Sequence, residues 1–299
     1  MIRPHVAALA RHHPRVENVW TFDPVALALA AVGLALYGQG FVRLRRRAGA
    51  VHAQAWRALL FVAGVAVSLF ALVSPIDAIG EDQLLAAHML QHLLLGDLGP
   101  LLIVLGAWGA LGVFLLPPPL LQLAARSPLR GLASFLLRPR VSLTVWFAAI
   151  AGWHIPAAYD AAIAHPALHV TEHTCFAVGG LLAWTQIVDP ARRRRLSVGQ
   201  RAMFAFAMLL ASGLLAEVLV ATHPLYPHYV DVRERPFGWS AGQDQSKAAL
   251  LMMAEQIATL ATAMTFLVRA HVERVAVELP GSADRISGAS RRQRTPPRP

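Results

Sequence analysis

The chain of 299 residues is poor in cysteine and in charge, and it lacks the short motifs of several enzyme classes. Its one cysteine, Cys175, excludes a disulfide within the chain and a metal site built on two thiolates. Charged residues are 15% of the sequence, against about 25% in an average soluble domain. No glycine-rich phosphate loop occurs, and no arrangement of serine, lysine and aspartate indicates a hydrolase. We therefore expect a protein that is not an enzyme.

Hydrophobic residues are abundant instead, at 56% of the chain, and the mean hydropathy is +0.49. Seven stretches are long enough to cross a hydrocarbon core of about 30 Å. They are residues 24–42, 57–73, 83–106, 141–157, 167–188, 199–221 and 247–269. The third stretch stays apolar beyond Pro100 as far as Leu116, which predicts either a kink or a re-entrant segment. The expected fold class is an all-α membrane protein, a bundle of seven transmembrane helices.

Arginine is distributed unevenly between the connecting segments, and this predicts the orientation of the chain. Residues 43–57, 117–140, 189–201 and the tail from 269 hold 21 of the 27 Lys and Arg residues, and the other connections hold 6. The richer set is expected in the cytoplasm, which puts the N-terminus outside and the C-terminus in the cytoplasm. We expect three parts: an outer N-terminal arm (1–23), the seven-helix transmembrane domain (24–270) and a basic, disordered cytoplasmic tail (271–299).

The net charge of +10 follows from the same pattern, because basic cytoplasmic loops meet anionic head groups of the lipid bilayer. Nucleic acid is not an expected partner, since no aromatic residues interleave with the arginines. The charge therefore indicates a membrane surface.

Five histidines inside the apolar stretches fall at one predicted depth, in the outer half of the membrane. They are His88 and His92, His154, and His169 and His173. Each pair has i,i+4 spacing, so both rings of a pair project from one face of a helix. Ionisable groups within a bilayer are costly and usually mark a functional site.

Other candidate ligands share this layer. They are Met89, Glu172, Glu217, Met252, Met253 and Glu255. Neutral imidazole binds copper, zinc, iron and nickel, while thioether sulfur selects Cu(I). The set favours a copper site, with haem iron as the competitor because paired histidines on facing helices often hold it. Asp97, deeper in the third stretch, is expected to pair with a neighbouring helix.

Structural roles compete with ligand roles at these positions. A membrane histidine can make an interhelical hydrogen bond, and His154 can serve as a polar cap at a helix end. Glu217 and Glu255 can be proton-relay groups, ligands or neutral hydrogen-bonded carboxyls. A haem protein that transfers electrons, a metal-free scaffold and a proton-coupled transporter therefore stay open beside a copper site.

Four segments together resemble the CtaG family of integral-membrane cytochrome c oxidase assembly factors. They are SPIDAIGEDQLLAAHMLQHLLLGDLGPLLIVLG, WHIPAAYDAAIAHPALHVTEHTCF, HPLYPHY and the GQDQ before the last stretch, within a resemblance that covers about residues 20–270. The resemblance implies a seven-helix, multi-pass protein of the bacterial plasma (inner) membrane. It also implies that the protein helps to mature haem–copper oxidases by aiding copper delivery to the catalytic subunit, so oxidase subunits are expected partners. For a copper site in the outer half of the membrane, we further expect an outer-side copper donor. A single-span copper chaperone that shares the family name uses a cysteine pair, which Cys175 alone does not match.

Overall fold

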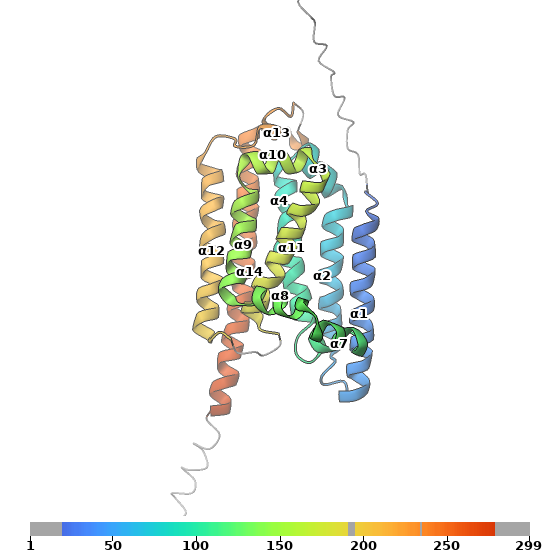
Figure 1. Cartoon of the computed structure of the whole chain (residues 1–299). Helices are drawn as coiled ribbons and strands as arrows, with labels where there is room; N and C mark the ends of the chain where they lie inside the picture. Colours follow the sequence, from blue (N-terminus) through green and yellow to red (C-terminus); the bar gives the residue numbers. More distant parts are fainter. Residues whose placement is uncertain (1–19, 191–194, 234, 279–299) are drawn as a thin grey trace, which may run out of the picture.

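The computed structural model describes residues 20–190, 195–233 and 235–278, and it is a helical bundle (Figure 1). No strand occurs among these residues, so the all-α prediction is confirmed. Seven helical segments run along the bundle axis: α1 (Pro24–Ala48), α2 (Ala55–Val73), the composite of α4 (Leu85–Leu93), η1 (Leu94–Leu98) and α5 (Gly99–Gly106), α9 (Pro139–Trp153), α11 (Pro166–Val188), α12 (Val198–Ala221) and α14 (Ala241–Glu278). The shorter helices are α3 (Pro75–Asp82), α6 (Leu111–Phe114), α7 (Pro118–Arg126), α8 (Pro128–Leu136), α10 (Pro156–Ala164), α13 (Pro227–Val230) and η2 (Pro236–Gly238).

The molecule is a multi-pass membrane protein, but fewer of its helices meet the requirements for a span than the sequence led us to expect. Within the described ranges, five helices are long and apolar enough, and α8 with α9, bent by 76°, makes a sixth if the pair is one span. Helix α11 has 23 residues, but its histidines and Glu172 lower its hydropathy. Each predicted stretch forms a helix, although the fourth breaks at His154 and Ile155, and the count of seven spans and the orientation are not confirmed.

The third span is interrupted just before its proline. Residues Leu94–Leu98 form one turn of π-helix, and α5 starts at Gly99 with Pro100 in its first turn. Proline lacks a backbone N–H, so a helix start tolerates it and a helix interior does not. The apolar run beyond Gly106 turns at Gly109 and ends in the short α6. Single π-turns are frequent at functional sites, and this one carries the buried Asp97.

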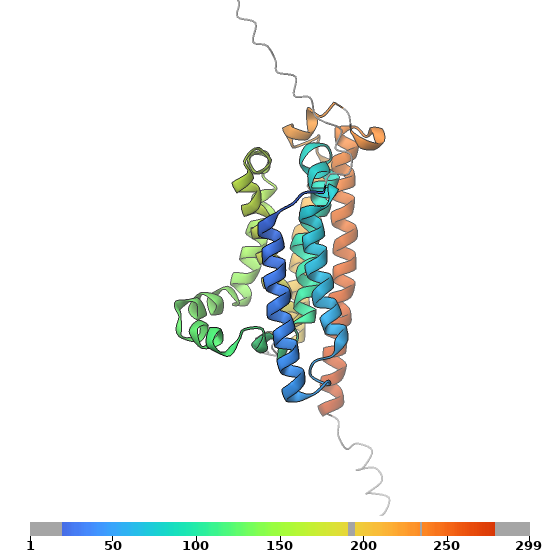
Figure 2. The ribbon, with the colours of Figure 1, turned by 90° about the vertical axis from the view of Figure 1, so that its right-hand side faces the viewer.

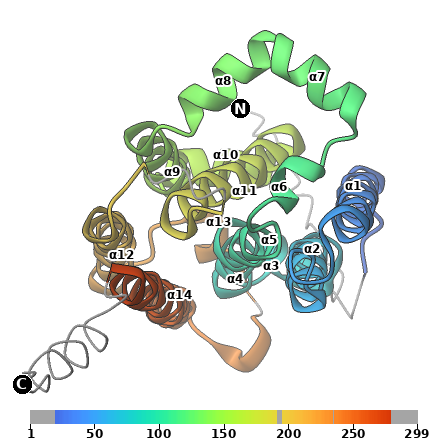
Figure 3. The ribbon, with the colours of Figure 1, turned by 90° about the horizontal axis from the view of Figure 1, so that it is seen from below.

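This composite helix packs against α2, α11 and α14 (Figure 3). Of the apolar stretch in this composite helix, 61% is buried inside the bundle. In α1 and in α2 the buried share is 17%, so these two helices mostly face outward. Glycines permit the close approach of its neighbours, as is common between membrane helices. A Cβ atom at Gly180 of α11 would overlap the carbonyl oxygen of Gly96 in η1. The α11–η1 contact therefore depends on a glycine.

Gly180→Ala is expected to lower the free energy of unfolding by about 2–3 kcal/mol, because α11 must move away from η1 to make room. The thermal midpoint of the detergent-purified protein measures the effect. Gly213→Ala in α12 is the matched control, since nothing lies within 4 Å of the added methyl group. Equal midpoints for the two variants would show that the contact is not as tight as described.

Short helices lie near both ends of the bundle but are arranged differently at each. Helices α3, α10 and α13 cover one end, while α7 and α8 project sideways near the other (Figures 1 and 2). Residues 1–19 of the expected arm and 279–299 of the expected tail lie outside the described residues. Helix α14 continues to Glu278, so residues 271–278, which we assigned to the tail, extend the last helix.

Candidate metal centre

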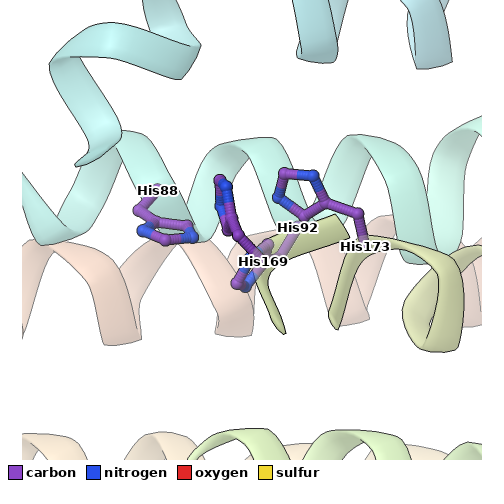
Figure 4. A group of neighbouring side chains, drawn as sticks. All are labelled: His88, His92, His169 and His173. Atoms are coloured by element: carbon purple, nitrogen blue, oxygen red, sulfur yellow. The ribbon is translucent and has the colours of Figure 1, made fainter. Parts of the chain in front are cut away.

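Two helices bring four of the predicted histidines together. Helix α4 has no cap from its own residues; instead the carboxylate of Asp244 in α14 accepts the N–H groups of Leu85 and Ala86, each at 2.9 Å. This fixes the start of α4 one turn before His88. Helix α11 starts at Pro166, a residue suited to the first turn of a helix. From these starts the i,i+4 pairs of both helices face each other (Figure 4).

The four rings form a compact, buried cluster, which we call the four-His cluster: His88, His92, His169 and His173. Ring centroids are 4.3 Å apart within the α4 pair and 4.1 Å apart within the α11 pair. Between the helices, His88 lies 5.3 Å from His169, and His92 lies 5.5 Å from His173. Each ring offers one nitrogen such that the four nitrogens lie within 4.8 Å of one another.

A tyrosine from the covering end determines which nitrogen of His88 faces the cluster. The hydroxyl of Tyr229 donates to the carbonyl oxygen of Gly80 at 2.6 Å, and it lies 2.9 Å from His88 Nδ1. Burial raises the pKa of Tyr229 well above its usual value, so the phenol keeps its proton. With that proton on Gly80, the hydroxyl must accept from His88 Nδ1–H. His88 Nε2 then carries a lone pair, and no partner for it exists in the described part of the chain.

A carboxylate determines the orientation of His169 in the same way. Glu81 Oε1 accepts from His169 Nδ1 at 2.7 Å, which leaves the buried Nε2 of His169 without a described partner. The Glu81 side chain is 40% exposed, so this contact lies where the cluster approaches the surface. His228 Nε2 contacts the backbone oxygen of Glu81 at 2.7 Å. Metal-binding histidines usually make such outer hydrogen bonds, which hold the ring and raise its basicity.

Glu172 supplies a carboxyl group beside the cluster. Its Oε1 lies 3.7 Å from His92 Nε2, and its side chain is 1% exposed. Neither oxygen of Glu172 has a hydrogen-bond partner among the described residues, and the same holds for both ring nitrogens of His92. Buried polar groups without partners are costly. A cation bound between the rings would satisfy the lone pair of one His92 nitrogen and a carboxylate oxygen of Glu172, but not the remaining N–H of His92.

His154 lies near the four-His cluster without joining it. Its Nδ1 lies 2.8 Å from the backbone oxygen of Ile150, so the ring caps the end of α9, as one of our two interpretations expected. Its Nε2 is buried without a described partner, and His154 lines a small cavity together with His92.

The remaining predicted ligands are divided between the interior and the surface. Met89 is buried in α4, and Met252 lines the cavity beside His92. Met253 and Glu217 are exposed on the outside of the bundle, so they do not face the four-His cluster. Glu255 is half-buried in α14 and does not belong to the four-His cluster.

The residues that our sequence analysis did not select are the ones that support the rings. Tyr229, Glu81 and Asp244 occur in the HPLYPHY, SPIDAIGED and GQDQ segments, whose likeness to the family was their only signal. Asp77 of α3 accepts from Gln91 Nε2 of α4 at 2.5 Å. Burial, and next the charge of Glu81, raise the pKa of Asp77 to about 6. This end of the bundle is therefore built around the start of α4.

The cluster is near the geometry of a four-coordinate metal site. In a tetrahedral site with metal–nitrogen distances of about 2.0 Å, the nitrogens are about 3.3 Å apart. Side-chain rotations that move each nitrogen by about 1 Å would bring the four nitrogens to that spacing. Four neutral imidazoles can hold a borderline or soft transition metal.

Comparison with known protein families assigns the chain to a family. The family model of the cytochrome c oxidase caa3 assembly factor (Caa3_CtaG) matches residues 35–273. The chain belongs to this family. The match includes both helices of the four-His cluster and Tyr229, and it makes the protein a cytochrome c oxidase assembly factor, which acts with oxidase subunits. Comparisons with curated proteins and with solved structures each gave no match. The role of an assembly factor agrees with the expectation that the protein is not an enzyme.

Proposed function

We propose that this assembly factor binds copper at the four-His cluster and delivers it to the catalytic subunit of a haem–copper oxidase in the bacterial plasma membrane. The observation that carries the proposal is a set of four buried imidazoles from two helices whose ligand nitrogens lie within 4.8 Å. The outer hydrogen bonds to Tyr229 and Glu81 support it, because they engage Nδ1 of both rings and leave the buried His88 Nε2 and His169 Nε2 without another described partner.

The composition of the site favours copper over zinc and haem. Zinc in structural sites prefers thiolates, and Cys175 is not part of the cluster. Met89 and Met252 line the cavity beside His92 and offer thioether sulfur to Cu(I). Haem needs far more room: cofactor pockets measure about 300–1,000 Å³, and the cavity at His92 measures about 30 Å³.

The structure of the four-His cluster also suits a copper ion that enters and is later released to the oxidase. Glu81 is partly exposed and touches His169, so an ion from an outer-side donor would meet a carboxylate before the first imidazole. Neutral imidazoles without a thiolate bind less tightly than a cysteine site, which permits release to the oxidase. The connections at the end of the bundle near the four-His cluster belong to the set that is poor in arginine. The arginine-rich set is the one expected in the cytoplasm, which supports an outer location for the cluster.

Elemental analysis and a visible spectrum of the detergent-purified protein test the proposal. We expect copper bound in proportion to protein, and no Soret band. A Soret band would identify a bis-histidine haem protein. Protein that stays free of metal after incubation with Cu(I), yet still co-purifies with the oxidase, would be a scaffold.

Tyr229→Phe is expected to weaken Cu(I) binding by about 10- to 100-fold, because the outer partner of His88 is lost while the ring stays in place. Competition with a chromophoric Cu(I) chelator measures the affinity. Tyr226→Phe is the matched control: its hydroxyl, in the same connection, donates to the backbone oxygen of His154 and not to the cluster. An equal loss in both variants would indicate a general effect of the hydroxyl on packing.

A further inference from the structure

Helices α7 and α8 form an arm that stands away from the bundle near its arginine-rich end (Figure 2). The axis of α8 is bent by 76° from that of α9, which runs along the bundle axis. Helix α8 therefore lies nearly across the bundle axis, as a helix at a membrane surface does. No residue of α7 or α8 is buried against the rest of the chain. The apolar side chains of the arm therefore lack a protein partner among the described residues.

Each helix of the arm has an apolar face and a polar face. In α8, Leu129, Leu132 and Leu136 recur at spacings of three and four residues, so they share one face, and Arg130 and Ser134 lie on the opposite side. Leu129 is 63% exposed and Leu132 is 53% exposed. Helix α7 likewise has three exposed leucines. A basic amphipathic helix parallel to the membrane buries such a face at the boundary between head groups and acyl chains.

The charges of the arm and its surroundings are positive. Residues 117–140 hold four arginines and no acidic residue. Arg138, at the corner where α8 meets α9, lies over the ring of Phe135, 5.4 Å from its centroid. Arg195 reaches the same corner, where its Nη1 donates to the backbone oxygen of Leu137 at 2.8 Å. Both arginines are exposed, and neither forms an ion pair with a carboxylate of the described residues.

A cavity of about 290 Å³ lies at this corner. Leu137 and Arg195 line it together with Leu196, Arg201 and residues at the ends of α5 and α11. Arg201 forms an ion pair with Asp189 at 2.6 Å, so Arg195 supplies the uncompensated charge of the lining. The volume is near the lower limit of pockets that hold small molecules, about 300 Å³. The cavity can therefore take a head group, but not the acyl chains of a lipid.

We propose that the corner between α8 and α9 binds one anionic phospholipid, with its phosphate at Arg138 and Arg195 and its acyl chains along the apolar face of α8. Guanidinium groups bind phosphate oxygens through paired N–H groups. Basic pockets between membrane helices on the cytoplasmic side suit anionic head groups, and the connections of this end are those expected in the cytoplasm. A zwitterionic lipid carries a cation next to its phosphate, which the two arginines repel.

This site is independent of copper binding. The four-His cluster contacts Tyr229 and Glu81, which belong to the short helices at the opposite end of the bundle (Figure 1). Loss of the lipid site would therefore leave the copper proposal as it stands, and loss of copper binding would leave the lipid site.

Binding of dioleoyl phosphatidylglycerol to the full-length, detergent-purified protein tests the site. Native mass spectrometry counts the lipids bound at each concentration, with dioleoyl phosphatidylcholine as the zwitterionic comparison. We expect one phosphatidylglycerol to bind about tenfold more tightly than phosphatidylcholine. Arg138→Gln combined with Arg195→Gln should lower the phosphatidylglycerol affinity by about 20-fold, since each arginine near an anionic lipid contributes about fivefold. Equal affinities of the wild type for the two lipids would overturn the proposal.

Arg45→Gln combined with Arg46→Gln is the matched control. Both arginines are exposed in the last turn of α1, at the same end of the bundle, and neither lines the cavity. The control removes the same charge as the test variant, so its lipid affinity should equal that of the wild type. Equal losses in the two double variants would show a diffuse attraction to the whole basic end, and no site at the corner.

Two further measurements distinguish a lipid from other occupants. Inorganic phosphate at millimolar concentration should not displace phosphatidylglycerol, because it has no acyl chains; displacement would indicate a site for a soluble anion. Leu129→Ser combined with Leu132→Ser should lower the lipid affinity and leave the thermal midpoint in lipid-free detergent unchanged, since both side chains are exposed. Unchanged lipid affinity in this variant, together with loss of co-purified oxidase, would assign the face of α8 to an oxidase subunit and overturn the lipid site.

Discussion

Replacing His88 and His92 together by alanine is expected to abolish the copper bound to the purified protein and to lower the copper content of the oxidase. The change removes two of four nitrogens from the cluster and leaves the α11 pair alone. Loss of an outer partner of a ligand costs about 10- to 100-fold in metal affinity, and the loss of two ligands must exceed that. Elemental analysis of the assembly factor and of the oxidase from the same cells measures both effects.

A second double variant, in which two other histidines are replaced by alanine, controls for the removal of two imidazoles. His165 and His223 are exposed residues in connections, outside the four-His cluster, so changing both to alanine should leave bound copper unchanged. Unchanged copper in the cluster variant, in both the factor and the oxidase, would defeat the proposal. A fall in oxidase copper with no metal ever found on the wild-type factor would instead support a scaffold.

The helices were predictable because length and apolar composition are strong signals, while the number of spans was not. Each predicted stretch forms a helix. Helix α11, however, carries His169, His173 and Glu172, and these polar side chains lower its mean hydropathy even though they are buried. The π-turn before Pro100 had no signal of its own, because it depends on how Gly96 and Gly99 pack against α11 and α2. Local sequence predicts a helix better than it predicts a defect in one.

The same contrast holds in the site. Spacing of four residues places two rings on one face of any helix, so each histidine pair was predictable. The rotation of each helix about its axis was not, since it depends on packing. Met252 and Met253 are neighbours in sequence, yet about 100° of helix rotation separates them, so one is buried and the other exposed. Tyr229 and Glu81 contact the rings from short helices at the end of the bundle. The spacing of the histidines in the sequence does not predict such contacts.

Asp244→Ala is expected to produce the largest loss of stability among the changes considered, although Asp244 is far from α4 in sequence. Its carboxylate accepts the N–H groups of Leu85 and Ala86, and its side chain is 1% exposed. Hydrogen bonds to a charged group contribute about 1.5–3 kcal/mol each. Alanine leaves two buried N–H groups without partners, so the expected loss is at least about 3 kcal/mol. A drop of the thermal midpoint on the order of 10 °C follows for a protein of this size.

Asp23 provides a matched comparison, because the same chemistry occurs there near the surface. Its carboxylate accepts from Val25 N and Ala26 N at the start of α1, where water can replace it. Asp23→Ala should therefore cost about 1 kcal/mol. His88 lies in the first turn of α4, so only Asp244→Ala should also weaken Cu(I) binding, and Asp244→Asn should restore part of both properties through its one acceptor oxygen. Equal midpoints for the two alanine variants would mean that the start of α4, and with it the position of His88, is held by packing alone.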